Sequence, residues 1–459
     1  MKYKKTPILT SKSGPYFIKL SKEAVDGKSN ILCEEICFIP DLLDIIDNIT
    51  NSIDIENSLS MLDSLCSTDE PRPNPNRLLY DTSLFDSIFY IALNNDDMNI
   101  LLHCLRILVH LSLANSLLDS PLLDPEIINQ FIIFLSSEYN NQIHRTILHF
   151  LLNISLDNDF TLQIATQIFN DHFIDEVSNI CISDCSPDDL ILTYRIGINI
   201  AQLIYENELF DDFIIFNSMI QSLVSSLKQA APQEYAIELL SYLFYNENCC
   251  KNSLNFNVID MIKQSLETLP ITSIPDAFTA INSLISNCNL IDEFIDNSVI
   301  SIAIDTIPKI ESDETHPFFV FFDSLAENRL NCLVDCGVIQ FLFYLLDGSL
   351  TNKKKSIFVL SDIIDQNVAV RPRPEWMTDA IILVLENAYS LTSKNAEIIM
   401  KLLIKIHDDD SRYFFFLMDQ ANLEECLDEI SRIDDISDTL LDYIQDLSDL
   451  VFRQEAIEE

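Results

Sequence analysis

The stretch NRLNCLVDCGVIQFLFYLL, residues 328–346, holds one of only five glycines in this chain of 459 residues. All-β folds and nucleotide-binding α/β folds need many glycines for turns and phosphate loops. Leucine, isoleucine, asparagine, aspartate and serine dominate the chain instead, and the last three favour helix caps and turns. The composition therefore predicts an all-α protein. The five glycines are Gly14, Gly27, Gly197, Gly337 and Gly348.

The chain repeats an apolar helical pattern that ends in a polar residue followed by leucine or isoleucine. Ten such anchor residues occur in series: Leu65, Leu111, Ile154, Leu203, Leu243, Leu284, Leu325, Ile363, Ile406 and Leu447. Their spacings are 46, 43, 49, 40, 41, 41, 38, 43 and 41 residues. A period of about 40–47 residues is typical of armadillo and HEAT repeats, whose units stack on their neighbours. The sequence thus predicts one helical solenoid.

The register relative to the anchors gives each repeated helix a buried side and an open side. Positions seven, four and three before the anchor are mostly apolar and share a stripe with it on a 3.6-residue helix. The position one before the anchor carries a polar group in all ten units, so we expect this column to face water or a ligand. The contact positions predicted from this register are His149, Asn153, Gln202, Glu238, Tyr242, Asp362, Asp442 and Asp446.

The formal charge of −44 restricts the partners. Double-stranded nucleic acid and anionic membranes are disfavoured, because their negative charge would be repelled. Proteins or peptide segments that are basic or extended are the favoured class. The alternative interpretation is that the charge serves only solubility.

Residues 1–30 form a basic arm that carries seven lysines, two acids and hence a charge of +5. Such an arm can contact the acidic body of residues 31–459, which we predict to be the repeat solenoid. No signal peptide and no apolar run of about 18 residues are recognised. We therefore expect a cytoplasmic or nuclear protein whose cysteines are reduced. The lysines of the arm are Lys2, Lys4, Lys5, Lys12, Lys19, Lys22 and Lys28.

Residues 328–346 resemble the armadillo consensus, in which a short first helix ends at a glycine and a second helix ends in a leucine pair. Gly337 and Leu345-Leu346 match those features. A glycine there allows a sharp corner that a side chain would obstruct. The resemblance, which spans roughly residues 31–459, implies a right-handed superhelix of about ten three-helix units with a concave groove. Weaker echoes occur at residues 256–269, 292–307 and 419–433.

The layout is similar to that of importin-α, which has a basic N-terminal segment followed by ten armadillo units. In importin-α each third helix presents a tryptophan and, four residues later, an asparagine, which together hold a basic nuclear-localisation peptide. Only Asn153 matches the asparagine, and His149 stands at its tryptophan position. The other tryptophan positions hold Ser60, Arg106, Ile198, Glu238, Thr279, Val320, Phe358, Lys401 and Asp442.

Two functional hypotheses follow, and neither is catalytic. The first is a divergent importin-α-like nuclear import adaptor that binds basic or extended segments in the groove. The second is a cytoplasmic or cytoskeletal armadillo scaffold with no transport role, which the missing tryptophan and asparagine ladder favours. No HExxH, GxSxG or Walker pattern occurs, so we expect no enzyme activity and no cofactor.

Some residue groups have both a structural and a functional interpretation. The pairs Cys33/Cys37, Cys181/Cys185 and Cys332/Cys336 could each supply half a metal site, but buried apolar packing is the favoured interpretation, and no metal is expected. His110 could respond to pH on the groove face, as could His149, unless local contacts satisfy them. The aromatic runs at residues 318–322 and 414–416 are expected to supply core between repeats, with some exposed contact sites as the alternative.

Overall fold

The computed structural model describes residues 42–67, 73–80, 83–114, 121–135, 139–157, 165, 186–370, 373–387, 392–433 and 436–458. The basic arm of residues 1–30 and the pairs Cys33/Cys37 and Cys181/Cys185 lie outside these ranges. All regular elements within them are helices, and no strand occurs there. The predicted all-α class is therefore confirmed.

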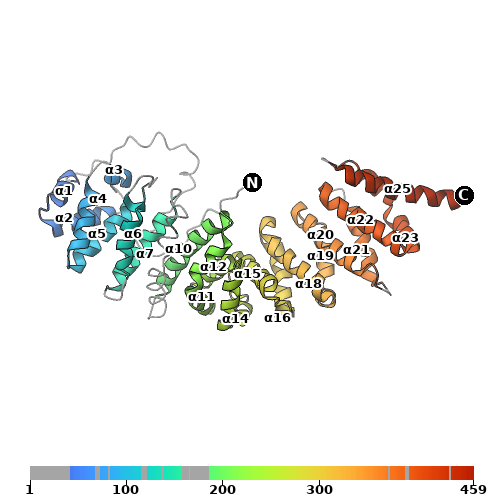
Figure 1. The fold of residues 1–459 in the computed structure, drawn as a ribbon, viewed down its shortest axis with the longest axis horizontal. Coiled ribbons are helices and arrows are strands. Elements are labelled where there is room, and N and C mark those ends of the chain that lie inside the picture. Colours follow the sequence, from blue (N-terminus) through green and yellow to red (C-terminus); the bar gives the residue numbers. More distant parts are fainter. Residues whose placement is uncertain are drawn as a thin grey trace. The chain divides into compact units, whose positions relative to one another are not determined.

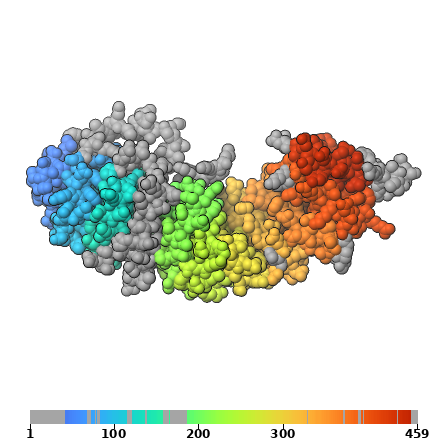
Figure 2. Space-filling view, in the orientation of Figure 1, coloured from blue at the N-terminus to red at the C-terminus, as the bar shows by residue number. Residues whose placement is uncertain are grey.

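Contacts between the helices divide the chain into two compact units, one ending at Met219 and the other beginning at Ile220. Within each unit, helices that follow one another in sequence are neighbours in space (Figure 1), and Figure 2 shows the same order on the surface. The first unit contains α1 (Leu42–Thr50), α2 (Ile55–Ser67), α3 (Pro75–Tyr80), α4 (Leu84–Asn94), α5 (Met98–Leu111), α6 (Pro125–Ile133), α7 (Asn141–Ser155) and α10 (Pro187–Glu206), with 3₁₀ turns η3 (Pro121–Leu123) and η4 (Phe210–Met219).

The second unit contains both long and short α-helices together with short 3₁₀ turns. Its α-helices are α11 (Ile220–Ser226), α12 (Gln233–Leu243), α13 (Glu247–Ser253), α14 (Val258–Ser265), α15 (Ile274–Cys288), α16 (Ile291–Phe294), α17 (Asn297–Thr306), α18 (His316–Asp335), α19 (Val338–Leu345), α20 (Leu350–Asn367), α21 (Glu375–Glu386), α22 (Ser393–Asp409), α23 (Ser411–Ala421), α24 (Leu423–Ile430) and α25 (Asp438–Glu458). The 3₁₀ turns are η5 (Leu254–Phe256), η6 (Ile271–Ser273), η7 (Ile307–Lys309) and η8 (Ser312–Thr315).

The ten anchors lie on ten helices, which we call the third helices. In the first unit they are α2, α5, α7 and α10, and in the second unit α12, α15, α18, α20, α22 and α25. Each packs on the next within its own unit. Eight of the ten anchors are buried, and the two exceptions, Leu65 and Leu203, are partly buried. The predicted apolar stripe is thus confirmed, and this successive stacking of helices is that of an α-solenoid.

Side-chain caps explain where many helices begin. Aspartate, asparagine or serine accepts a hydrogen bond from a backbone N–H of the first turn at Asp97, Asp124, Asn140, Ser186, Asn246, Asp296, Ser349 and Asp410. Each cap contributes about 1 kcal/mol to helix stability. The composition-based expectation of asparagine, aspartate and serine caps is therefore confirmed.

Left-handed backbone forms a corner before three of the short helices in the second unit. Gly337, with a φ of 76°, precedes α19, as the sequence predicted. Asn257 precedes α14 with a φ of 59°, and Asn422 precedes α24 with a φ of 48°. Asparagine is one of the few residues with a side chain that adopts this conformation readily. The echoes at residues 256–269 and 419–433 therefore place asparagine where the armadillo-like stretch has glycine.

The boundary expected before residue 328 is less distinct in the structure. Helix α18 runs from His316 to Asp335 and so includes both the third helix of one repeat and the first helix of the next. The only break is a kink at Arg329, where φ is −148° and ψ is 52°. The sequence from Leu325 to Leu333 contains neither glycine nor proline, which explains why the helical path resumes at once.

Replacing Gly337 by alanine is expected to destabilise the second unit by about 1 kcal/mol, the usual cost of left-handed backbone for a residue with a Cβ. No atom lies within 4 Å of the added Cβ, so the cost comes from the backbone and not from a clash. Urea denaturation of the purified protein would measure the loss.

Gly337→Asn is the matched variant, and it should lose less stability than Gly337→Ala, because asparagine occupies the equivalent corners. Equal stability of alanine, asparagine and glycine at this position would show that the left-handed corner is not required.

Candidate functional site

The third helices carry a partly open face at the positions five and one before each anchor. In the second unit all twelve such residues are partly or fully exposed, whereas the anchors of the same helices are buried. We call these twelve residues the third-helix face: Glu238, Tyr242, Thr279, Ser283, Val320, Ser324, Phe358, Asp362, Lys401, Lys405, Asp442 and Asp446. Five of the eight predicted contact residues lie on it, from α12, α20 and α25.

In the first unit the same positions are less uniform. His110 is only 4% exposed, and its Nε2 lies 2.8 Å from the carbonyl oxygen of Pro73. Ile198 is also buried. The expectation that the whole polar column faces water or a ligand is therefore wrong at His110, whose ring is buried with Nε2 against a backbone carbonyl from the preceding segment.

Asn153 lies on α7 and fastens it to α5. Its Nδ2 donates to the Ser112 hydroxyl at 3.0 Å and to the Val109 carbonyl at 3.3 Å. The one asparagine that matches the importin-α pattern is thus used in a structural contact between repeats. Gln202, on α10, is exposed, and its Nε2 donates to Glu206 at 3.1 Å.

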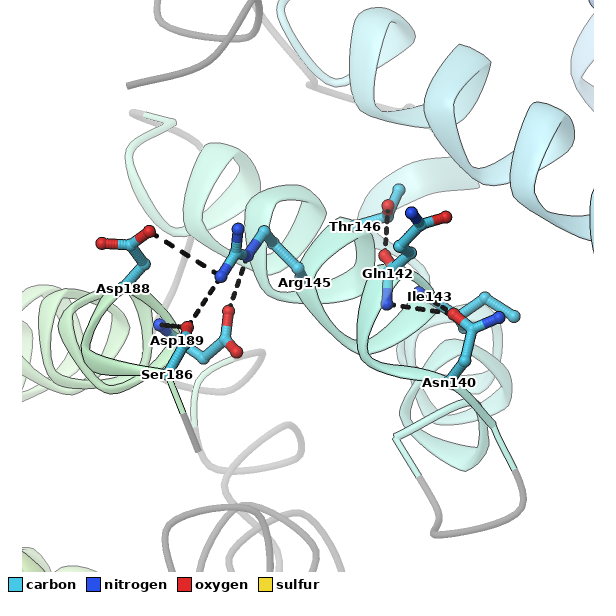
Figure 3. A network of polar contacts seen from close by, with 8 residues as sticks. All are labelled: Asn140, Gln142, Ile143, Arg145, Thr146, Ser186, Asp188 and Asp189. Atoms are coloured by element: carbon cyan, nitrogen blue, oxygen red, sulfur yellow. Dashed lines mark hydrogen bonds and ion pairs between the residues drawn. The ribbon is translucent and has the colours of Figure 1, made fainter. Parts of the chain in front are cut away.

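An ionic junction joins α7 and α10 (Figure 3), and its charges act on His149 of α7. Arg145 Nε donates to Asp189 at 2.7 Å, and another guanidinium nitrogen donates to the Ser186 hydroxyl at 2.7 Å. Burial, followed by the positive charges of Arg145 and Arg195, lowers the pKa of His149 to about 4, and Asp189 acts in the opposite direction. His149 is therefore neutral at physiological pH and makes no cationic contact with a partner.

In the second unit, Asp362 on α20 faces Asp323 on the adjacent helix α18. Both carboxyl groups are half-buried. Burial, and then the negative charge of Asp323, raises the pKa of Asp362 to about 7. Burial, and then Glu327, also raises the pKa of Asp323. Asp323 was not predicted as a functional residue, since its position two before the anchor holds mixed residue types in other repeats.

Phe358 lies one helical turn before Asp362 on α20 and is 41% exposed. It is the one aromatic residue among the tryptophan-equivalent positions, so the sequence contained a signal for it, although it was not among the predicted contact residues. An exposed ring beside a carboxyl group combines an apolar surface with an anion. This pairing suits a lysine or arginine side chain, whose long stem is apolar and whose end is cationic.

The last third helices add charges of both signs. Lys405 on α22 forms an ion pair with Asp365 on α20 at 2.6 Å, and Lys401 lies 5.5 Å from the ring centroid of Tyr443 on α25. The predicted residues Asp442 and Asp446 are exposed one turn apart on α25. In the α20–α25 part of the face, the lysines are therefore engaged within the protein, and Asp442 and Asp446 are directed to solvent.

The other groups singled out in the sequence have structural roles. Phe318, Phe319, Phe321 and Phe322 are all buried, which confirms that this aromatic run is core. The thiols of Cys332 and Cys336 are 3.9 Å apart, and Cys336 also contacts the Asn297 side chain. Both cysteines are partly exposed, so the expected buried apolar packing is wrong for this pair. No group of three or more metal-ligating side chains occurs in the described part of the chain.

Two charged residues near helix starts also have structural explanations. Asp410 caps α23 and accepts a hydrogen bond from Arg373, whose guanidinium stacks 3.9 Å from the Tyr413 ring centroid. Lys355, in the basic run that opens α20, donates to Thr315 and to the Ser312 carbonyl. Within the described ranges, no helix is long and apolar enough to cross a membrane.

Comparison with known proteins extends only to the fold. No protein-family profile matches the chain, and no curated protein matches its sequence. An engineered protein whose crystal structure comes from the Northeast Structural Genomics Consortium is 14% identical with a TM-score of 0.71, and the match covers 90% of this chain and 99% of that chain. A second engineered protein from the same consortium has 14% identity and a TM-score of 0.41, over 53% of this chain and 97% of that chain. At this identity the first likeness concerns the fold alone.

His149 is expected to titrate with a midpoint near pH 4, well below the ~6.5 of an unfolded chain. Because its folded pKa is lowered, the neutral ring stabilises the first unit above pH ~6.5, and this contribution is lost as the pH falls from ~6.5 through about 4. NMR titration of the histidine ring protons would measure the midpoint, and His149→Gln would assign the signal. A midpoint between 6 and 7 would show that the ring is solvated.

Proposed function

We propose that this chain is a non-catalytic protein-binding module of the cytoplasm or nucleus. Its second unit would bind an extended segment of a partner protein that carries lysine or arginine. The third-helix face is the proposed binding surface, and the observation that carries the proposal is the exposed ring of Phe358 beside the Asp323–Asp362 carboxyl pair.

The chemistry of that place favours a cationic side chain. A lysine stem can pack on the ring of Phe358 while its ammonium group approaches Asp362, one turn away on the same helix. An ammonium or guanidinium group near an aromatic face gains about 0.5–1 kcal/mol at an exposed site, and a charge-assisted hydrogen bond to a carboxylate adds to this. Anionic groups continue along the face at Asp442 and Asp446.

The spacing of the helices favours an extended segment. Packed helices lie about 8–10 Å apart, and an extended chain advances about 3.3 Å per residue. A bound segment would therefore present about one side chain in three to each successive third helix. A folded basic domain would not present its side chains at this regular spacing to successive third helices.

We further propose that the repeats are about ten armadillo-type units in a right-handed superhelix. Of the two functional forms, the scaffold is favoured by Asn153, whose amide is bonded to Ser112 and Val109 between repeats. The importin-α-like adaptor remains the alternative, with the basic arm of residues 1–30 as an internal competitor for the face. Neither form requires a cofactor, nucleic acid or membrane.

A fluorescent lysine-rich peptide is expected to bind the full chain, with an affinity that falls as salt screens the interaction. Phe358→Ala should weaken binding by up to about fivefold, the equivalent of ~1 kcal/mol for an exposed cation–π contact. Fluorescence anisotropy at low and physiological salt would measure both effects. Replacing the arm lysines with glutamine in the full chain should tighten binding if the arm competes for the face.

Tyr344→Ser is the matched control, because Tyr344 is a 66% exposed aromatic residue on α19, which is not one of the third helices. It should leave the affinity unchanged. The proposal fails if the arm-substituted chain does not bind the peptide, or if Phe358→Ala and Tyr344→Ser have the same effect.

A further inference from the structure

Lys401 places a positive charge on the α22 part of the third-helix face, next to helices whose face residues are anionic or aromatic. Its side chain is exposed, and its ammonium group lies 5.5 Å from the ring centroid of Tyr443 on α25. Helix α22 packs against both α20 and α25 and lies between them (Figure 1). The lysine therefore stands between Phe358 and Asp362 of α20 and the exposed Asp442 of α25.

The acid nearest in sequence to Lys401 on its own helix is occupied elsewhere. Glu397 lies four residues earlier on α22, at a spacing where an acid and a lysine commonly pair. Its carboxylate instead accepts a hydrogen bond from the Ser437 hydroxyl. No carboxylate of the described residues forms an ion pair with Lys401, whose contact is the ring of Tyr443. An ammonium group has three donors, so this ring contact leaves capacity for an anion.

The second lysine of this part of the face is neutralised within the protein. Lys405 donates to the Asp365 carboxylate at 2.6 Å and to the backbone carbonyl of the same residue at 2.9 Å. Asp365 lies in the last turn of α20, where carbonyl groups lack a helical partner and a cation is favourable. Lys405 therefore joins α22 to the end of α20, and the charge of Lys401 is the one left for a partner.

The spacing of the three helices determines which residues of a bound segment meet them. Packed helices lie about 8–10 Å apart. A polyproline II segment advances about 3.1 Å per residue with three residues per turn, so every third residue lies on the same side at intervals of about 9.3 Å. A β-strand directs residues three apart to opposite sides. The polyproline II conformation thus matches successive third helices.

We propose that the face of α20, α22 and α25 selects a polyproline II segment with the pattern basic-x-x-acidic-x-x-basic. This inference rests on the proposed function and specifies its partner. One basic side chain packs on Phe358 and approaches Asp362, as described above. The acidic side chain meets Lys401, and the other basic side chain meets Asp442. The order of charges is the same read from either end, so it fits both directions of the bound chain.

The acidic residue in the middle provides a specificity that net charge alone does not. A chain with a formal charge of −44 attracts any basic segment, whatever the order of its residues. Lys401 distinguishes segments of equal charge, because an acidic residue opposite it is attracted and a basic one is repelled. An exposed pair of this kind changes affinity by about two- to fivefold.

Two peptides of identical composition provide the test, with the full chain in which the arm lysines are replaced by glutamine. The patterned peptide is Lys-Pro-Pro-Glu-Pro-Pro-Lys and the reordered peptide is Glu-Pro-Pro-Lys-Pro-Pro-Lys, each with blocked termini and a fluorescent label. The prolines favour the polyproline II conformation, and the equal net charge removes non-specific attraction from the comparison. Fluorescence anisotropy at physiological salt should show the patterned peptide binding about two- to fivefold more tightly.

Lys401→Glu in the same chain should reverse this preference, since the new carboxylate repels glutamate and attracts lysine. Lys228→Glu is the matched control, because it makes the same change of charge at an exposed lysine between α11 and α12, outside the third-helix face. It should leave the preference for the patterned peptide unchanged.

The outcomes separate this inference from the proposed function. Equal binding of the two peptides by the arm-substituted chain would overturn the inference but leave a face that binds basic segments. Equal effects of Lys401→Glu and Lys228→Glu on the preference would also overturn it. If neither peptide binds, both the inference and the proposed function fail.

Discussion

Apolar contact between successive third helices is the constraint on which the rest of the structure depends. A single repeat of a solenoid has too little interior to bury its own apolar stripe, so the stripe is buried against the neighbouring repeat. Leu243, Leu284 and Leu325 show this on α12, α15 and α18, where each anchor is fully buried. Once these contacts fix the succession of helices in the second unit, the positions five and one before each anchor are left partly or fully exposed. The third-helix face thus results from the packing of the core. Its residues can be substituted without disturbing that core.

Polar contacts then distinguish repeats that the apolar stripe makes alike. Asp63, Asn282 and Asp323 occupy the same position relative to their anchors. Asp63 lies 2.7 Å from a ring nitrogen of His103 and 3.3 Å from Arg106, Asn282 donates to a backbone carbonyl, and Asp323 lies near a second carboxyl group. The repeats therefore share one architecture but differ in the polar groups that meet at each interface.

The sequence predicted the helices and their buried sides because these follow from local periodicity. The anchors and the residues three before them are almost all buried, and the cap at Ser186 and the corner at Gly337 occur where residue type favours them. The corners at Asn257 and Asn422 could also have been found, since asparagine tolerates left-handed backbone.

What the sequence did not predict are pairings between helices. His110 meets the Pro73 carbonyl and Asn153 meets Ser112, and each pairing depends on how one helix is offset along its neighbour. The same holds for Asp323 and Asp362. Such offsets are set by the shapes of many packed side chains, and the composition of either helix alone does not contain them. The register could therefore place a residue on one face of its helix but could not predict which residue of the adjacent helix it contacts.

The long-range side-chain hydrogen bonds described between repeats span 33 to 44 residues of chain, from Cys250 with Ser283 to Asn199 with Ser155. This separation does not grow with the length of the protein, so each repeat closes a loop of similar size when it docks on the one before it. The entropic cost of loop closure is then divided into similar small contributions, one for each repeat that docks. A chain of this kind has a low relative contact order for its length, which favours rapid folding that can begin in any well-packed repeat and spread to its neighbours.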